Sequence, residues 1–406
     1  MFSKGIHVTL LLLIASQQIP PSAALSASHV LNRTSKSWHR LSKRGALLAR
    51  DLRISLHQIS GVGFDISSYT PQKVVCARPD TLAFGGDATS TSPATSSAAP
   101  TASATPVYQL VESHIGENFF DGWSFFGNVD NATAGAVNYL NEEDAFSSGL
   151  ITASNADGRT IIKMDTTPRI TGYRDSIRIT TKNTFTGGVF VLDAYHMPHG
   201  CAVWPAFWTN AYTSGQGVND NTNNQATLHT DTGCTLSSEI STTSTLVETT
   251  DCDGNLDSNP GCGYLSTSNM TYGEGFNSNG GGVYAMHWSN DGISVYFFPR
   301  GSIPTDIQNG APTPDSWGTP MAHWSSKTCD IAKFFKSHWV LINTTLCGYW
   351  AGNGWNSSGS PGQETSCAVR TGYASCEDFV RNSGSSFSEA YWDIASVKVY
   401  QTSRKT

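Results

Sequence analysis

The stretch GISVYFF, Gly292–Phe298, alternates apolar residues with other residues along its length. Ile293, Val295 and Phe297 stand at every second position, so in an extended chain their side chains project from one face. This period of two predicts a β-strand that buries one face in a core.

The same period recurs far away in the chain. SIRITTK at 176–182 places Ile177 and Ile179 on one face, and SVKVYQ at 396–401 does so with Val397 and Val399. Short strands of this kind, separated by Gly, Asn and Pro turns about every 8–12 residues, are typical of a β-sandwich. A content of 38 Gly, 11% aromatic and 14% charged residues agrees with an all-β fold. We see no helical period of comparable length and no internal repeat.

The N-terminus has the layout of a secretory signal peptide. Residues 1–24 carry Lys4, an apolar run from Val8 to Ala15 and the small-residue stretch PSAA. That run is too short to span a bilayer, which needs about 20 apolar residues. The C-terminal QTSRKT has no hydrophobic tail of the kind that precedes a lipid anchor. We expect a protein that is secreted, extracellular or held in the cell wall, with no membrane partner.

Composition divides the rest of the chain into three parts. Residues 25–86 form a pro-region or an unassigned segment, in which LSKR at Leu41–Arg44 is either a dibasic processing site or an exposed loop. Residues 87–106 are almost all Ala, Ser, Thr and Pro, a composition that cannot bury a core and predicts a linker. Residues 107–406 carry the strand pattern and form the predicted folded domain.

The net charge argues against one class of binding partner, and the cysteine content indicates an oxidising compartment. Residues 1–44 hold six Lys or Arg and no acidic residue, so their removal takes the net charge from −7 to about −13, which argues against a nucleic-acid partner. Eight of the nine cysteines fall between Cys201 and Cys376 and allow up to four disulfides, but in 105 pairings, so we assign none. Five sequons are compatible with glycosylation: Asn32, Asn131, Asn269, Asn343 and Asn356.

From Tyr108 onward the chain resembles glycoside hydrolase family 16, in particular the fungal laminarinase-like endo-β-1,3(4)-glucanases. The segments that carry the resemblance occur in family order: FFDGWSFF (Phe119–Phe126), GAVNYL (Gly135–Leu140), HMPHGCAVWPAFWTN (His196–Asn210), GVNDNTNNQATLHT (Gly217–Thr230), GGGVYAMHW (Gly280–Trp288), FFPRGSIPTDI (Phe297–Ile307) and AYWDIASVKVYQ (Ala390–Gln401).

The resemblance implies a concanavalin-like jelly roll of two antiparallel sheets that binds β-glucan polysaccharide. Aromatic faces match the apolar faces of pyranose rings. From the matching segments we expect Trp204, Trp208, His229 and Trp288 to bind substrate, with burial in the sandwich core as the alternative for each tryptophan. We expect a monomer without a cofactor, with a structural calcium as the alternative.

The catalytic strand of the family is missing. Enzymes that this chain resembles carry Gly-Glu-Ile-Asp-Ile-Ile-Glu just before Gly-Val-Asn-Asp, with the first Glu as nucleophile and the last as acid/base. Here WPAFWTN runs through AYTSGQ directly into GVND, so Gln216 stands at the acid/base position, or is a turn residue. A retaining mechanism needs two carboxylates, so we predict that this chain is inactive, with no intact catalytic residue.

No other segment replaces the lost carboxylates. NEEDAF (Asn141–Phe146) and DCDG (Asp251–Gly254) are predicted to be solvated turns. His287 and Tyr349 stand where relatives usually have Glu and Asp. Asp251, Asp253, Asn255 and Asp257 imitate the start of a calcium loop but lack its sixth-position Gly and twelfth-position Glu. We predict no metal site, because His196 and His199, three residues apart, would face opposite sides of a strand.

Three hypotheses follow. The chain is a β-glucan hydrolase whose catalytic strand is absent through a misdrawn or misspliced exon, or a non-catalytic glucan-binding or cell-wall accessory protein, or a structural wall component. The transcript across Asn210–Gly217 separates the first two. Loss of a central strand also predicts unpaired backbone groups in its neighbours, and hence low stability.

Overall fold

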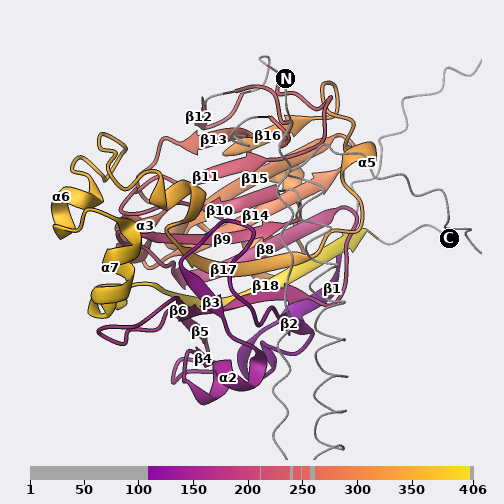
Figure 1. Ribbon diagram of the computed structural model, residues 1–406. Helices are drawn as coiled ribbons and strands as arrows, with labels where there is room; N and C mark the ends of the chain where they lie inside the picture. Colours follow the sequence, from indigo (N-terminus) through magenta and orange to yellow (C-terminus); the bar gives the residue numbers. More distant parts are fainter. Residues whose placement is uncertain (1–107, 211, 238–240, 248, 257–260, 403–406) are drawn as a thin grey trace, which may run out of the picture. The chain divides into compact units, whose positions relative to one another are not determined.

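The strands with a period of two form two eight-stranded sheets and a small third sheet (Figure 1). The computed structural model describes residues 108–402 except 211, 238–240, 248 and 257–260. The predicted signal peptide, pro-region and linker, with Asn32, lie outside the described residues. Pairing is antiparallel throughout both large sheets, as the sandwich prediction requires.

Sheet A is built around the long strand β18, which pairs with β8, β5 and β1. Its path is β16 (Ala322–Ser325), β15 (Gly292–Pro299), β14 (Gly282–Ser289), β8 (Gly188–His196), β18 (Tyr391–Thr402), β5 (Thr160–Lys163) and β4 (Ile151–Thr152), with β1 (Tyr108–His114) on β18.

Sheet B runs β12 (Ser244–Val247), β13 (Cys262–Ser266), β11 (Gln225–Leu228), β10 (Tyr212–Gln216), β9 (Val203–Thr209), β17 (Val340–Leu346), β7 (Arg178–Thr181) and β2 (Trp123–Phe125). A two-stranded parallel sheet joins β3 (Val137–Tyr139) to β6 (Arg174–Ser176).

The main core lies between the inner faces of the two large sheets. Ile179 of β7, Val295 of β15 and Val399 of β18 are all buried in it, as their spacing predicts. A second cluster gathers under the C-terminal helices around Trp355 and Phe379. The alternation of apolar residues therefore identified the inward faces of these strands correctly.

Short helices and helical turns occupy the connections. Their bounds are η1 (Gly116–Asn118), α2 (Glu142–Ser147), α3 (Gly273–Ser278), η2 (Arg300–Ser302), α4 (Thr305–Gln308), η3 (Pro314–Ser316), α5 (Ile331–Phe334), η4 (Gly348–Gly352), α6 (Cys367–Thr371), α7 (Cys376–Asn382) and η5 (Gly384–Phe387). NEEDAF was predicted to be a turn, but it forms most of α2, because the side chain of Asn141 caps the helix by accepting a hydrogen bond from the backbone N–H of Asp144. In the described part of the chain, we find no helix with the length and apolarity needed to cross a membrane.

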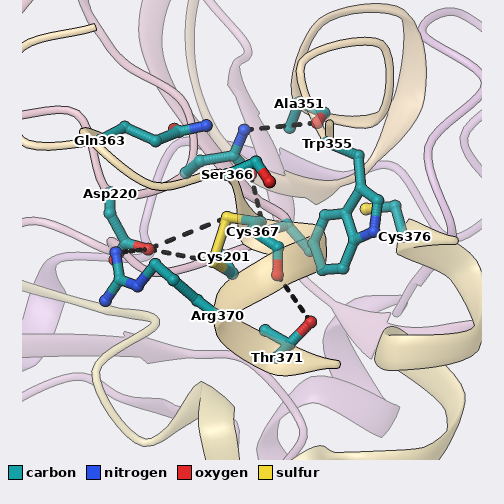
Figure 2. Close-up of a disulfide and its surroundings, with 12 residues drawn as sticks. Cys201, Asp220, Ala351, Trp355, Gln363, Ser366, Cys367, Arg370, Thr371 and Cys376 are labelled. Atoms are coloured by element: carbon teal, nitrogen blue, oxygen red, sulfur yellow. Dashed lines mark hydrogen bonds and ion pairs between the residues drawn. A yellow bond between two sulfur atoms is a disulfide. The ribbon is translucent and has the colours of Figure 1, made fainter. Parts of the chain in front are cut away.

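All eight cysteines of the folded domain are paired. The disulfides are Cys201–Cys367, Cys234–Cys329, Cys252–Cys262 and Cys347–Cys376, so the upper limit of four that the sequence allows is reached. Figure 2 shows the first of them, which ties the start of α6 to the segment before β9, with Asp220 and Arg370 beside it. The pairing could not be predicted because it joins segments up to 166 residues apart.

The segment Tyr212–Gln216 forms strand β10 inside sheet B. β10 pairs with β9 from Tyr212 opposite Thr209 to Gln216 opposite Ala206, and it pairs with β11 on its other side. The two neighbouring strands therefore do not face each other across a gap. Our premise that they would be left with unpaired backbone groups is wrong, because five residues are enough to bridge them.

Candidate functional site

The outward face of sheet B carries the aromatic side chains that the sequence singled out on β9. Trp204 and Trp208 are half-buried, whereas Val203, Phe207 and Thr209 between and beside them are buried in the sandwich. Successive side chains of a strand point to opposite faces. The two tryptophans therefore lie on the same face, four residues and about 13 Å of strand apart.

Trp208 is held by a hydrogen bond from the neighbouring strand. Its indole Nε1 donates to Oδ1 of Asn343 on β17 at 2.7 Å, and the guanidinium of Arg178 lies 5.4 Å from the centre of its ring. Asn343 also donates from Nδ2 to the hydroxyl of Tyr139 at 3.3 Å. These contacts orient the indole and leave part of its surface accessible on the outward face.

Asn343 is therefore a structural residue and not a glycan carrier. Its side chain is only 9% exposed and both ends of its amide are hydrogen-bonded. Of the sequons that are compatible with glycosylation, we therefore do not expect this one to carry a glycan. Asn131, Asn269 and Asn356 are exposed and remain predicted acceptors.

Trp204 lies toward the other end of β9. Its ring meets Trp350 of η4 edge to face, with the ring centres 5.6 Å apart. In register it lies opposite Thr345 of β17. Tyr349, the neighbour of Trp350, is 63% exposed. The indole of Trp204 is thus braced by a turn that the sequence did not connect with it.

Gln216 ends β10 in the middle of this face. It lies opposite Ala206 of β9 and Gln225 of β11, it is 7% exposed, and its backbone N–H donates to Oδ1 of Asn224 at 2.7 Å. The next residue must be glycine, since a Cβ at Gly217 would lie 2.6 Å from the ring of Tyr272. Gln216 is therefore a strand residue, not a turn residue.

The sheet around Gln216 holds no carboxylate. Among the described residues, none of the eight strands of sheet B contains Asp or Glu. One acidic group that contacts sheet B is Asp130, whose carboxylate accepts hydrogen bonds from the hydroxyls of Thr345 and Tyr139 and from the backbone N–H of Thr133. A carboxylate with this many donors braces the loop on β17.

Sequence reasoning did not find Asp130. An Asp followed three residues later by Thr is a common local turn, and Asp130 does accept from Thr133 in that way. The bond to Thr345, 215 residues away, leaves no signal in the sequence.

The other two predicted substrate-binding residues lie in different surroundings. His229 follows the last residue of β11, is half-buried, and packs against Gly261, where an added Cβ would come within 2.7 Å of its ring. Trp288 is on β14 of sheet A, only 4% exposed, with its ring stacked on Phe190 in the main core. The prediction that Trp288 binds substrate is wrong, because β14 turns this side chain between the sheets.

His196 and His199 lie close together, contrary to the expectation from strand geometry. β8 ends at His196, so the alternation of faces does not extend to His199. Their rings are 6.1 Å apart, and both lie near Glu389. Burial lowers the pKa of both imidazoles below the ordinary value, so both rings are neutral at pH 7.

In the loop that begins at Asp251 and resembles a calcium site, a carboxylate accepts hydrogen bonds from residues of the loop and its neighbour. The carboxylate of Asp253 accepts from the hydroxyl of Thr232 at 2.5 Å and from the backbone N–H of Asn255 at 2.8 Å. Asp257 lies outside the described residues. Within the described part of the loop, the acidic side chains serve the turn itself.

Comparison with known proteins assigns the domain to a family. The family described as the XgeA-like, catalytic GH16 domain matches residues 123–400. The chain is 39% identical over 305 residues to a probable glycosidase of Schizosaccharomyces pombe, an alignment that covers 72% of this chain and 69% of that protein. It is 38% identical over 334 residues to a probable endo-1,3(4)-β-glucanase of Aspergillus fumigatus, covering 80% of this chain and 50% of that protein. The chain thus spans about half the length of the Aspergillus relative.

Solved structures agree with the fold. Laminarinase 16A of family GH16 from Phanerochaete chrysosporium, with β-glucans in its donor and acceptor sites, is 36% identical and superposes with a TM-score of 0.65, covering 73% of this chain and 100% of that one. An elongating family 16 β-1,3-glucosyltransferase is also 36% identical, with a TM-score of 0.64 and coverage of 72% and 100%.

Proposed function

The chain belongs to glycoside hydrolase family 16, and from this premise we propose that it binds β-glucan on the outward face of sheet B without cleaving it. One observation carries the proposal: sheet B has aromatic side chains on its outward face, but its described strands contain no carboxylate. Trp204 and Trp208 are present and braced, whereas β10 presents Gln216 in place of an acid.

Binding is supported by the chemistry of the two indoles. A glucose ring has apolar faces that pack on an aromatic ring and bury area at low entropic cost. Trp208 is fixed by Asn343 and Trp204 by Trp350, so little side-chain freedom is lost when a sugar docks. The relatives named as β-glucanases and the laminarinase with bound β-glucans support this class of ligand.

The absence of hydrolysis is supported by the number of carboxyl groups that the retaining mechanism needs. That mechanism needs two carboxyl groups about 5–5.5 Å apart, one as nucleophile and one as acid/base. In the described part of sheet B there is none, and an amide cannot replace an acid/base, because it neither donates nor accepts a proton at ordinary pH. Asp130 alone cannot supply both roles.

A second candidate function is that of a retaining β-glucan hydrolase made from a longer message. It is favoured by the sharpness of the junction, since Trp204–Asn210 and Gly217–Thr230 keep the family pattern on both sides of β10. Sequencing of the transcript across Asn210–Gly217 tests it. A message that encodes Glu-Ile-Asp-Ile-Ile-Glu at this point replaces the binding-only proposal.

We also propose that the protein acts outside the cell. The signal-peptide layout of residues 1–24 supports export, and four disulfides are typical of an oxidising compartment. A polysaccharide of the cell wall would be accessible there. Cell fractionation of the native host with detection of the protein tests this localisation.

The proposed function is tested with purified protein and laminarin. We expect binding by calorimetry and no release of reducing sugar above background. Trp208→Ala should weaken binding at least tenfold, because truncation of an aromatic anchor costs on the order of 2 kcal/mol. The control is Tyr173→Ala, an aromatic residue that is 55% exposed and not on sheet B, which should bind as the wild type does. Reducing-sugar release that Trp208→Ala abolishes would refute the binding-only proposal.

A further inference from the structure

Three side chains from two distant parts of the chain meet at one end of sheet A. His196 is the last residue of β8, His199 lies in the connection to β9, and Glu389 lies just before β18. Their ligand atoms all lie within 4.8 Å of one another. The backbone N–H of His199 donates to the carbonyl of Glu389 at 3.3 Å, so the two segments are joined independently of the side chains.

The hydrogen bonds of His196 show which of its nitrogens has the lone pair that a cation would need. Nδ1 lies 2.8 Å from the backbone carbonyl of Tyr391, which can only accept, so Nδ1 carries the proton. In the neutral ring, Nε2 then holds a lone pair. A ring nitrogen bonded to a backbone carbonyl is also the usual outer partner of a metal-binding histidine, because it fixes the tautomer and the ring orientation.

Nε2 of His196 faces a second acceptor. It lies 3.2 Å from Oε2 of Glu389. When the proton of the neutral imidazole is on Nδ1, no proton lies between Nε2 and Oε2, so the two atoms do not form a hydrogen bond. In a tetrahedral zinc site, with ligands about 2.0–2.1 Å from the metal, neighbouring ligand atoms are about 3.3 Å apart. The distance of 3.2 Å between Nε2 of His196 and Oε2 of Glu389 is close to this value.

The wider surroundings favour a cation. The carboxylates of Asp220, Glu274 and Glu389 all act electrostatically on the ring of His199. Within the described part of the chain, Asp220 alone of the three pairs with an arginine or lysine, Arg370, at 2.6 Å (Figure 2). Asn277 donates from Nδ2 to Nε2 of His196 at 2.9 Å and to the carbonyl of Met197 at 3.1 Å, so its amide keeps one acceptor if a metal takes the lone pair of Nε2.

We propose that His196, His199 and Glu389 form a binding site for a divalent transition-metal ion, with zinc as the ion that the ligand set fits best. Two imidazoles and one carboxylate are ligands that zinc accepts, and a fourth position stays open to water. The ion would join the end of β8, the connection to sheet B and the start of β18. The cluster includes neither Trp204 nor Trp208, so the proposal does not depend on the proposed function.

The test uses the full chain without a polyhistidine tag, stripped of metal, and zinc ions alone as the probe. We expect the wild type to bind one equivalent of zinc in competition with a chromophoric chelator, and zinc to raise its midpoint of thermal unfolding. His199→Ala and Glu389→Gln should each bind zinc at least tenfold more weakly and lose the thermal shift. Both side chains are partly exposed, so these variants should fold.

The controls separate this cluster from the other side chains that bind metals weakly. His323→Ala removes a half-buried histidine on β16, and Glu143→Gln removes an exposed glutamate on α2, so both should bind zinc as the wild type does. Absence of stoichiometric binding by the wild type would overturn the proposal. So would binding that both cluster variants retain, because zinc would then be held elsewhere.

Discussion

Gln216 is held in place on sheet B although its side chain is not an acid. It keeps its place on the outward face between Ala206 and Gln225, and its backbone is held by Asn224. An amide has nearly the shape of a carboxyl group, but it cannot shuttle a proton.

We therefore predict that Gln216→Glu does not restore activity. It returns one carboxyl group to the face, but a retaining mechanism also needs a nucleophile, and the described strands of sheet B offer none. Reducing-sugar release from laminarin should stay at background, with binding of laminarin as the control for an intact face. Measurable hydrolysis by this variant would mean that a nucleophile stands elsewhere.

His338 should make stability depend on pH. Burial lowers its pKa from 6.5 to about 4, and the ring is hydrogen-bonded to the hydroxyl of Thr209 at 3.0 Å. Above pH 6.5 the ring is neutral in both the folded and the unfolded state and contributes nothing. As pH falls from 6.5 to 4 the unfolded state takes up the proton first, so the free energy of unfolding decreases, by about 3 kcal/mol at most.

The check is denaturant unfolding of wild type and His338→Gln at pH 7.0 and 4.5. Burial also lowers the pKa of His196, His199, His287 and His323, so both proteins should lose stability at low pH. The wild type should lose more than the variant. Equal losses would contradict the role of His338.

Only some of the site residues could be identified from the sequence. Trp204 and Trp208 stand four apart on one strand, so a period of two already places them on the same face. For Trp288 the same period shows only that its side chain and those of its two neighbours point to opposite faces of the strand. It does not show which of these faces lies in the core. Which face of β14 points inward depends on Phe190 of β8, which lies almost a hundred residues earlier.

The strand β10 is where the proposal of binding without hydrolysis on the outward face of sheet B can be tested. It has the length and pairing to complete sheet B, but its sequence, YTSGQ, has no acidic residue. The strand order places it between β9 and β11, directly beside the strand that carries both tryptophans. Sheet architecture and catalytic content are therefore separable in this protein.

We predict that grafting the catalytic strand creates hydrolysis. Residues 211–216 would be replaced by the corresponding segment of an active relative, ending in Glu-Ile-Asp-Ile-Ile-Glu, which restores both carboxylates between unchanged flanks. The graft should release reducing sugar from laminarin, and the same graft with its first Glu changed to Gln should not. A graft that binds laminarin but stays inactive would show that the flanks are no longer competent.

Three strands, β7, β15 and β18, were predicted from the sequence, whereas the short helices were not. The apolar residues of these strands repeat at every second position. Helix α2 has only six residues and depends on the cap at Asn141, so its pattern is too short to distinguish it from a turn.

The disulfides stabilise the domain unequally. Cys201–Cys367 spans 166 residues, whereas Cys252–Cys262 spans 10. In the chain-entropy description, closing the longer loop contributes about 5 kcal/mol and closing the shorter one about 3 kcal/mol, because the longer loop removes more freedom from the unfolded state.

We therefore expect the double substitution of Cys201 and Cys367 by Ala to lower the free energy of unfolding more than that of Cys252 and Cys262. Both pairs lose the same atoms, so each variant is the control of the other. Equilibrium unfolding in urea measures the difference. An equal or larger loss in the Cys252 and Cys262 variant would contradict the dependence on loop length.

The sequence by itself determined three of the strands, the family resemblance and the absence of Asp and Glu from Tyr212–Gln216, because each is encoded in residues that are neighbours along the chain. Only the tertiary structure decided which cysteines pair, that Trp288 is core, that β10 closes the sheet and that His196 meets Glu389, 193 residues away. These features depend on contacts between distant segments. Such contacts form only when the two sheets and their connections are packed together.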